Sequence, residues 1–322
     1  MDTEPAIDVR NLSVTFRRRD GNMAAVNNAG FALARGEVLT ILGESGSGKS
    51  VTLKAMMGLL PEYAAVTGEV RVAGRDILTL PPPTLAKVRG RELSMIFQEP
   101  MAALDPVYTI GEQIAETIVQ HEGVTNAEAN RRALALLERV AIPSAARRLK
   151  NYPHEMSGGM RQRAMIALAL ACNPTVLLAD EPTTALDVTV QIQILLLLRE
   201  LQQELGMSVI FVTHDIGVAA EISDRIAVMY AGRFVETGTV RDIIRKPKHP
   251  YTKGLLNSTV HGALRGKRLE TIPGSPPSLR ALPQGCAFSP RCTLANDICL
   301  TAQPDATMTG PGAIVRCFQA AA

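Results

Sequence analysis

The chain has 322 residues, 46% of them hydrophobic and 20% charged, and a net charge of +3 at pH 7. This length and composition predict a globular protein of one large or two modest domains with a substantial core. The small net charge does not argue for a nucleic-acid partner. No apolar run approaches the roughly eighteen residues that a membrane span needs, and the acidic first residues show no signal peptide. We therefore expect a cytosolic protein with reduced cysteines, so any membrane role must come through a partner.

The first predicted elements are strands. Apolar and polar residues alternate from Ile7 to Phe16, which is typical of strands with one buried face. Phe16 could stack on a nucleobase, although taken alone it is better explained as a core residue. Val38–Leu42 is apolar and β-branched, as expected for a buried strand. The stretch from Gly68 to Leu80, which includes Glu69–Gly74, predicts a small hairpin region.

A phosphate-binding loop follows the strand at 38–42. The residues Gly43-Glu44-Ser45-Gly46-Ser47-Gly48-Lys49-Ser50 fit the pattern G-x-x-x-x-G-K-[ST] at every fixed position. Glycines let the backbone N–H groups face the phosphates, and the start of the helix predicted over Val51–Leu60 favours anions. Lys49 can reach the β- and γ-phosphates, and the Ser50 hydroxyl can ligate Mg²⁺. A chance glycine-rich turn is the alternative, but it does not account for the flanking strand and helix.

A helical stretch then interrupts the α/β alternation. A short strand at Leu93–Phe97 ends at Gln98, which by itself is ordinary turn chemistry. From Tyr108 to about Ala171 the pattern is helical, with a capping box predicted at Thr125–Glu128, so we expect an inserted helical subdomain. It ends at Ser157-Gly158-Gly159, which opens an apolar helix. This tripeptide is either an anion-binding arrangement or a plain N-cap with a glycine hinge.

Two further buried strands carry polar residues at their ends, where open α/β sheets bind ligands. Val176–Ala179 delivers Asp180 and Glu181, which would be costly to bury unless they face a metal ion or water. Asp180 suits Mg²⁺, and Glu181 suits a general base that activates water. The strand Val209–Thr213 carries His214, a candidate site residue because it ends a core strand in a chain with a phosphate loop.

The α/β pattern ends near Arg245. A helix over Val190–Leu205 and two strands around Ala231-Gly232 are its last predicted elements. Beyond them, prolines crowd a stretch with little periodicity. We therefore expect a tail subdomain without a large core of its own.

The tail holds four of the five cysteines, Cys286, Cys292, Cys299 and Cys317, spaced C-x5-C-x6-C-x17-C. The C-x2-C pairs of zinc fingers are absent from this spacing, and disulfides are disfavoured in the cytosol. Four thiolates can hold a [4Fe–4S] cluster, and a metal site would stabilise a poorly cored tail. We therefore predict an iron–sulfur site, with four unligated cysteines as the alternative.

Taken in order, these motifs resemble those of an ABC-type ATPase over about residues 6 to 245. The matches are Gly43–Ser50 with the Walker A loop, Gln98 with the Q-loop, Ser157-Gly158-Gly159 with the signature, Val176–Glu181 with Walker B and its catalytic glutamate, Ala185-Leu186-Asp187 with the D-loop, His214 with the switch histidine, and Phe16 with the adenine-stacking aromatic. The family's signature usually ends in Gln, where this chain has Met160. The serine and glycine donors of the signature remain.

The resemblance implies a fold, cofactors and roles for the matched residues. The fold is α/β: a P-loop ABC ATPase core with an antiparallel β subdomain, an inserted helical subdomain and a small C-terminal extension that carries the cysteines. The cofactors are ATP and Mg²⁺. The implied ligands of ATP are Phe16 and Gly43–Ser50, those of Mg²⁺ are Ser50, Gln98 and Asp180, and the catalytic residues are Glu181, His214 and Gln98. ATP would lie between two subunits, with the Walker residues of one facing the Ser-Gly-Gly of the other.

Finer features look like the dipeptide/oligopeptide importer branch of this family. They are Gly43–Ser47, Phe97–Met101, His249–Thr252 and Ile272–Pro277, the last followed by the cysteines. In that branch the assembly has two ATPase subunits, here expected to be distinct, two membrane subunits and an extracytoplasmic binding protein. Some members bind an iron–sulfur cluster in the tail. The resemblance implies a peripheral protein on the cytoplasmic face of a bacterial inner membrane.

Other functions fit less of the sequence. A nickel or glutathione importer uses the same subunit pattern, because the substrate is chosen by other subunits. A soluble ABC ATPase acting on ribosomes or DNA usually has two cassettes or a coiled-coil insertion, which this chain lacks. Glu181 and His214 argue against a non-hydrolysing regulatory subunit. We expect an ATPase domain over 1–245, with its helical subdomain over about 100–171, and the extension over 246–322.

Overall fold

The computed structural model describes residues 4–19, 21–184, 186–258 and 271–320. Contacts between Cα atoms divide the chain into two compact units. The first unit comprises Met1–Ile7, Leu33–Glu37 and Arg71–Phe211, and the second comprises Asp8–Ala32, Val38–Val70 and Val212–Ala322. Each unit is therefore assembled from segments that lie far apart in the sequence.

Short, wholly buried strands form the centre of the first unit. β6 (Leu93–Ile96) and β7 (Val176–Asp180) pair in parallel, with Leu93 opposite Val176. β8 (Ser208–Thr213) follows β7 in the strand order. Every residue of these strands is buried, which explains why their sequences are continuous apolar runs rather than alternating ones. The strands predicted in these three stretches are confirmed.

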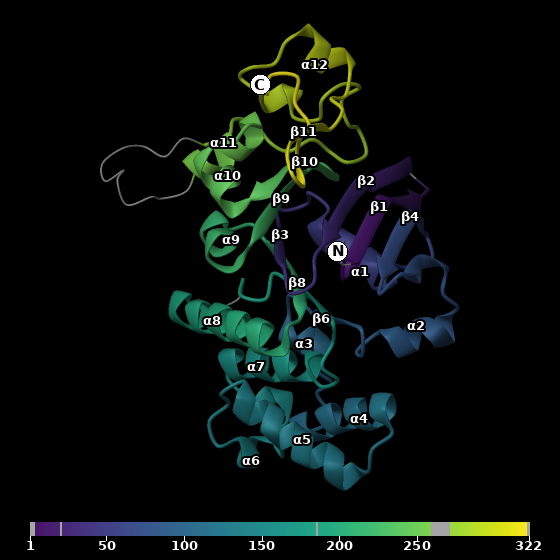
Figure 1. Cartoon of the computed structure of the whole chain (residues 1–322), viewed down its shortest axis with the longest axis vertical. Helices are drawn as coiled ribbons and strands as arrows, with labels where there is room; N and C mark the ends of the chain where they lie inside the picture. Colours follow the sequence, from purple (N-terminus) through teal and green to yellow (C-terminus); the bar gives the residue numbers. More distant parts are fainter. Residues whose placement is uncertain (1–3, 20, 185, 259–270, 321–322) are drawn as a thin grey trace. The chain divides into compact units, whose positions relative to one another are not determined.

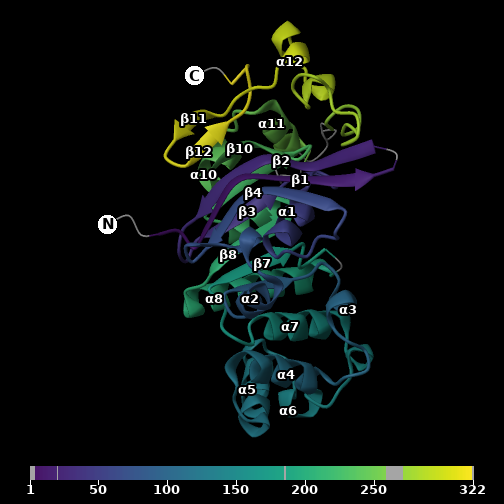
Figure 2. The same ribbon diagram turned by 90° about the vertical axis from the view of Figure 1, so that its right-hand side faces the viewer.

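The helices of the first unit include the predicted helical subdomain, which contains α3 (Pro100–Ala103), α4 (Ile110–Glu122), α5 (Asn126–Arg139), α6 (Ala145–Arg148) and α7 (Gly158–Ala169). α4 packs against α5, and α7 contacts both (Figures 1 and 2). The remaining helices are α2 (Pro82–Val88) and α8 (Val188–Leu205), with short 3₁₀ turns η1 (Ile77–Thr79) and η2 (Pro153–Glu155). α8 ends at Leu205 and is capped by Gly206, whose φ of +62° lies in the left-handed region that glycine favours.

The helix caps differ in detail from the prediction. Thr125 caps α5 by accepting a hydrogen bond from the Glu128 N–H, but the Glu128 carboxylate pairs with Arg131. The reciprocal capping box is found instead at Thr109 and Glu112, at the start of α4. Both sites have the Thr-x-x-Glu spacing, so the difference lies in the basic residue one turn after Glu128 that competes for its carboxylate.

The second unit contains most of the long strands at the start of the chain. β1 (Ile7–Arg18) lies between β2 (Gly21–Leu33) and β4 (Ala64–Val72) in the strand order. The end of β4, from Arg71, belongs to the first unit, where it pairs antiparallel with β5 (Arg75–Asp76). Of the apolar residues that alternate along β1, Ile7, Val9, Leu12 and Val14 are buried, and Phe16 is half-buried. One continuous strand therefore accounts for the alternation predicted from Ile7 to Phe16.

A second group of strands in this unit carries the phosphate loop. β3 (Val38–Leu42) pairs in parallel with β9 (Arg225–Tyr230), which pairs antiparallel with β10 (Arg233–Thr239) through the predicted turn at Ala231-Gly232. α1 (Lys49–Met56) follows the loop. α9 (Ile216–Ile222) contacts β3, and α10 (Val240–Arg245) contacts β9 and β10.

The tail is built onto these strands. It contains α11 (Pro250–Asn257), η3 (Ser289–Arg291), α12 (Asp297–Thr301), β11 (Thr307–Gly310) and β12 (Ala313–Val315). β12 pairs with β10, placing Val315 opposite Glu236, and β11 pairs with β12 (Figure 2). The Tyr251 and Phe288 rings pack on the Tyr230 ring of β9, with centroids 4.6 and 5.2 Å away. The tail thus shares an aromatic core with the β9–β10 hairpin, which the sequence does not predict.

These elements confirm the predicted α/β class. Parallel pairs occur at β6–β7 and β3–β9, the first strands of the chain form an antiparallel β part, and the helical insertion and the tail follow in the expected order. Among the described residues, no helix combines the length and the hydropathy needed to cross a bilayer.

Candidate functional site

The phosphate loop lies in the second unit between β3 and α1, and its glycines are required by close backbone approaches. A Cβ atom on Gly43 would lie 2.3 Å from the carbonyl oxygen of Met229. Gly48 has a φ of +107°, and a Cβ there would lie 2.5 Å from the carbonyl oxygen of Ala25. Since Gly48 is also the N-cap of α1, the loop runs directly into the anion-favouring end of the helix.

The polar groups of the loop fit a phosphate chain. Lys49 is only 4% exposed, and its Nζ donates hydrogen bonds to the carbonyl oxygens of Gly43 at 2.9 Å and Glu44 at 3.0 Å. The Ser47 hydroxyl is buried and has no hydrogen-bond partner among the described residues. Buried hydroxyls are normally partnered, so this one is suited to a ligand oxygen. Ser50, the predicted Mg²⁺ ligand, is half-buried in the first turn of α1.

Two other predicted residues belong to the second unit. Phe16 is half-buried near the end of β1, with its ring centroid 5.9 Å from that of Tyr63. Tyr63 is 51% exposed, so a second aromatic ring, which the sequence interpretation missed, lies beside Phe16. His214 is exposed directly after β8. The next residue, Asp215, caps α9 by accepting hydrogen bonds from the N–H groups of Gly217 and Val218.

The acidic pair lies in the first unit, at the end of β7. Asp180 is the last residue of the strand and is buried. Glu181 has a φ of +45°, in the left-handed region that costs free energy for a residue with a side chain. Its Oε2 accepts a hydrogen bond of 2.9 Å from the Thr184 hydroxyl. The structure therefore brings Thr184 to the predicted general base, a contact that the sequence interpretation missed.

The signature residues start α7. Ser157 is the N-cap, and its hydroxyl accepts a hydrogen bond of 3.3 Å from the Met160 N–H. A Cβ atom on Gly159 would lie 3.1 Å from Cγ1 of Val190 in α8, whereas one on Gly158 would meet no atom within 4 Å. Packing against α8 thus explains why position 159 is a glycine. The packing of the described residues does not explain why position 158 is one.

The remaining predicted residues of the first unit are surface groups. Gln98 is exposed two residues beyond β6. Asp187 is the N-cap of α8, and its Oδ1 accepts a hydrogen bond of 3.0 Å from the Val190 N–H. Because of this cap, α8 begins at Val188, two residues before the predicted start. Ala185, the first residue of the predicted D-loop, lies outside the described residues.

The second residue of the phosphate loop has partners in the tail. The Glu44 N–H donates a hydrogen bond of 3.0 Å to the phenol oxygen of Tyr251, and the Glu44 carboxylate pairs with Arg291. Burial raises the pKa of the Tyr251 phenol, which therefore stays neutral. The sequence singles out His249–Thr252 as a feature of the importer branch, but it gives no signal for these contacts.

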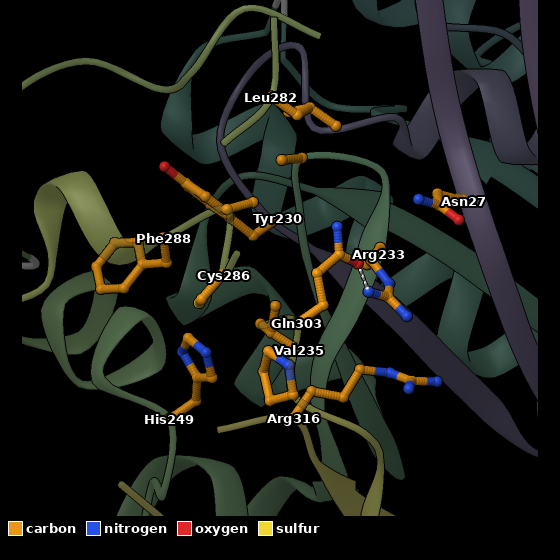
Figure 3. A pocket seen from close by; sticks show the side chains of 13 residues that line it. Asn27, Tyr230, Arg233, Val235, His249, Leu282, Cys286, Phe288, Gln303 and Arg316 are labelled. Atoms are coloured by element: carbon orange, nitrogen blue, oxygen red, sulfur yellow. Dashed lines mark hydrogen bonds between the residues drawn. The ribbon is translucent and has the colours of Figure 1, made fainter. Parts of the chain in front are cut away.

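The cysteines of the tail do not form a metal site as they lie. Over the described residues, which include all four cysteines, no group of three or more His, Cys, Asp or Glu side chains is gathered to hold a metal ion. Burial raises the pKa of the Cys286, Cys292 and Cys317 thiols, and the charges of neighbouring cysteines add to the rise. Figure 3 shows Cys286 in a pocket with Tyr230, His249 and Phe288.

Comparisons with known proteins agree with these motifs. The ABC transporter family model matches residues 26–184, and the model of the oligopeptide/dipeptide transporter C-terminal region matches residues 235–299. The chain is 49% identical to the oligopeptide transport ATP-binding protein OppD of Escherichia coli (strain K12) over 313 residues, covering 97% of this chain and 93% of that one. OppD of Salmonella typhimurium has the same identity and coverage.

Solved structures give the same assignment. A dimeric ATP-binding cassette in a post-hydrolysis state, bound to ADP and Pi, matches with a TM-score of 0.66 and 31% identity, covering 73% of this chain and 99% of that one. The cbiO1 protein of Clostridium perfringens, part of an ABC transporter complex, matches with a TM-score of 0.64 and 27% identity, covering 76% and 92%. The chain therefore belongs to the family of ABC transporter ATP-binding proteins that carry the oligopeptide/dipeptide transporter C-terminal region.

Proposed function

We propose that this chain is the ATP-hydrolysing subunit that powers an ABC importer for dipeptides and oligopeptides. The observation that carries the proposal is the phosphate loop, with its buried Lys49 and its unpartnered buried Ser47 hydroxyl, in a chain that matches the oligopeptide transport ATP-binding protein OppD almost end to end. Family membership implies ATP and Mg²⁺ as cofactors and membrane-embedded transporter subunits as partners.

Each predicted site residue has a proposed role in hydrolysis. The loop Gly43–Ser50 binds the phosphates, and the Phe16 ring stacks on the adenine. Ser50, Gln98 and Asp180 would hold Mg²⁺, which would supply positive charge to the phosphates. Glu181 takes a proton from the attacking water, and His214 contacts the γ-phosphate. The Thr184 hydroxyl supports this assignment, since it holds the Glu181 carboxylate in one orientation.

The signature is proposed to act on a partner. Ser157, Gly158 and Gly159 would face the nucleotide of a second, related ATPase subunit, and Asp187 would lie at the same interface. Gly158 supports this assignment, because a methyl group there would meet open space in the isolated chain. We propose a heterodimer of ATPase subunits on the cytoplasmic face of an inner membrane, with two permease subunits and an extracytoplasmic solute-binding protein. The ATPase domain would span residues 1–245 and the extension residues 246–322.

The test is ATP hydrolysis and peptide uptake by the assembled transporter carrying Glu181→Gln. A positioned general base contributes roughly a hundred- to ten-thousandfold to rate, so turnover and uptake of a labelled oligopeptide should be lost while ATP still binds. Glu200→Gln, the same substitution at an exposed position of α8, is the matched control and should behave as wild type. Near-normal hydrolysis by Glu181→Gln would overturn the base. Hydrolysis that oligopeptides do not stimulate would overturn the substrate class.

The four tail cysteines are proposed as ligands of a [4Fe–4S] cluster. Support comes from their position in one small subdomain, where burial and, to a smaller extent, the charges of neighbouring cysteine thiolates raise the pKa of Cys286, Cys292 and Cys317. Their side chains would have to rotate to bind, because they are not arranged as a metal site. Protein purified anaerobically should be brown, absorb near about 400 nm and contain iron and sulfide. Cys292→Ser should lose the iron, and Cys172→Ala, outside the tail, should keep it. Colourless, iron-free wild-type protein would exclude the cluster.

A further inference from the structure

Arg291 of the tail forms a bidentate ion pair with Glu44 of the phosphate loop. Arg291 lies at the end of η3, and its side chain is only 4% exposed. Its two terminal nitrogens donate to the Glu44 carboxylate, Nη1 to Oε2 at 2.7 Å and Nη2 to Oε1 at 3.1 Å. Its Nε donates to the Pro273 carbonyl oxygen at 2.9 Å, and its guanidinium lies 5.9 Å from the Tyr230 ring centroid. The guanidinium is therefore fixed on several sides.

Glu44 is the residue through which the loop is held. Its N–H donates to Tyr251, and its carboxylate accepts from Arg291. Its carbonyl oxygen accepts hydrogen bonds from Nζ of Lys49 at 3.0 Å and from the N–H of Ser47 at 3.2 Å. A shift of Glu44 would therefore move the anchor of the phosphate-binding lysine.

The segment that presents Arg291 is bracketed by two cysteines, Cys286 and Cys292. The Ser289 N–H donates to the Cys286 carbonyl, and the Cys292 N–H donates to that of Ser289. Phe288, in the same segment, packs its ring edge-on against Tyr230. The position of Arg291 thus depends on the short fold between the two cysteines.

The negative charge of Glu44 connects the ion pair to nucleotide binding. Glu44 belongs to the loop whose N–H groups face the phosphates, where an uncompensated carboxylate would repel a triphosphate. Arg291 supplies a compensating positive charge and holds the carboxylate with the planar geometry that a guanidinium matches. If the ion pair served only to anchor the tail, the carboxylate that binds Arg291 could come from any neighbouring segment. Here the carboxylate comes from the phosphate loop.

We propose that Arg291 is a positioning residue of the ATP site, which neutralises Glu44 and fixes the phosphate loop from the cysteine-bearing tail. The inference rests on the proposed ATP binding at this loop. It assigns to the segment Cys286–Cys292 a direct influence on nucleotide affinity.

The test is calorimetric titration of the full chain with a Mg²⁺ complex of a non-hydrolysable ATP analogue. Arg291→Met should raise the Kd about tenfold, because it leaves the Glu44 carboxylate beside the phosphates without a counter-charge. The double variant Arg291→Met with Glu44→Gln should recover a Kd within about threefold of wild type, since the repelling charge is removed. Arg225→Met is the matched control. That arginine donates hydrogen bonds to the carbonyl oxygens of Ala32 and of Gly312 in the tail, and its loss should leave the Kd unchanged.

The outcomes separate the inference from the proposed function. Wild-type chain that does not bind the analogue would overturn the proposed function itself. Folded Arg291→Met with a wild-type Kd would overturn the role of Arg291. A double variant that binds as weakly as Arg291→Met would show that the arginine acts only through the fold of the tail. If Arg291→Met does not fold, Arg291→Lys replaces it. The lysine keeps the charge but not the two parallel bonds, so a Kd raised about threefold supports the role and an unchanged Kd overturns it.

Discussion

The hydroxyl of Thr184 donates a hydrogen bond of 2.9 Å to Oε2 of Glu181. Glu181 also has a left-handed backbone, with a φ of +45°. Its carboxylate is therefore directed by the strained backbone and by one neighbouring side chain, as is typical of residues whose orientation matters for function.

Thr184→Val should lower kcat for ATP hydrolysis without a comparable change in KM. A hydrogen bond to a charged group contributes about 1.5–3 kcal/mol, which corresponds to roughly a tenfold to 150-fold loss of rate. Thr184→Ser keeps the hydroxyl and should retain most of the activity. Steady-state kinetics of the assembled transporter measure both constants. An unchanged kcat in the valine variant would show that Thr184 does not position the base.

Gly158→Ala should reduce ATPase activity of the assembled transporter by about tenfold to a hundredfold, because a methyl group would enter the space proposed for the partner's nucleotide. No atom of the described residues lies within 4 Å of the new Cβ. The melting temperature and ATP affinity of the isolated chain should therefore stay unchanged. Gly159→Ala is the comparison, since it crowds Val190 and should also lower the melting temperature. Full activity of Gly158→Ala in the transporter would contradict the assignment.

Phe16→Ala should weaken ATP binding by roughly fivefold to a hundredfold, because stacking of a base on an aromatic ring contributes about 1–3 kcal/mol. Phe16→Tyr keeps the ring and should bind normally. Stacking tolerates any base, so GTP affinity should fall by a similar factor. Titration with both nucleotides checks this expectation, and an unaltered ATP affinity would mean that Phe16 is only a packing residue beside Tyr63.

The tail should lose stability in acid through His249. Burial lowers the pKa of this side chain to about 4, although a hydrogen bond with the Arg316 backbone opposes the effect. The unfolded state therefore binds a proton at higher pH than the folded state. The contribution of neutral His249 to the free energy of unfolding is complete above about pH 6.5 and is lost as the pH falls towards 4, with a magnitude of up to about 3 kcal/mol.

His249→Asn should remove this part of the pH dependence. Asparagine does not titrate and can still accept the hydrogen bond that the Tyr251 N–H donates to Nδ1 of His249 at the start of α11. Urea denaturation followed by tyrosine fluorescence at pH 7 and pH 5 measures the difference. His154→Asn, at an exposed position, controls for the loss of a histidine. Equal acid sensitivity in wild type and His249→Asn would contradict the expectation.

Local patterns predict the central strands and the phosphate loop. β3, β7 and β8 are buried throughout, so their apolar runs identify them without any knowledge of their neighbours. Gly48 and Lys49 likewise belong to a motif that is recognised within eight consecutive residues. Helix boundaries are predicted less accurately. α8 starts two residues before its predicted start, because the Asp187 cap adds two residues that do not follow the helical periodicity.

Contacts between distant segments are not predicted by such patterns. Arg291 and Glu44 are separated by 247 positions, and nothing near either residue indicates the other. β12 has three residues and becomes a strand because β10 offers it unpaired backbone groups. The aromatic core of the tail is missed for the same reason, since the Tyr230 ring on which Tyr251 and Phe288 pack belongs to β9.

The β11–β12 hairpin also forms the edge of the sheet next to β10. β10 has seven residues, and β12 pairs with Glu236 and Thr237 on its side away from β9. An unprotected strand of that length offers its N–H and C=O groups to any other chain. β11, which ends the series, is short, largely exposed and irregular between Met308 and Gly310, and is therefore a poor template for further pairing. The β11–β12 hairpin thus protects β10 from pairing with another chain. Shortened versions that end before Thr307 should therefore aggregate through β10.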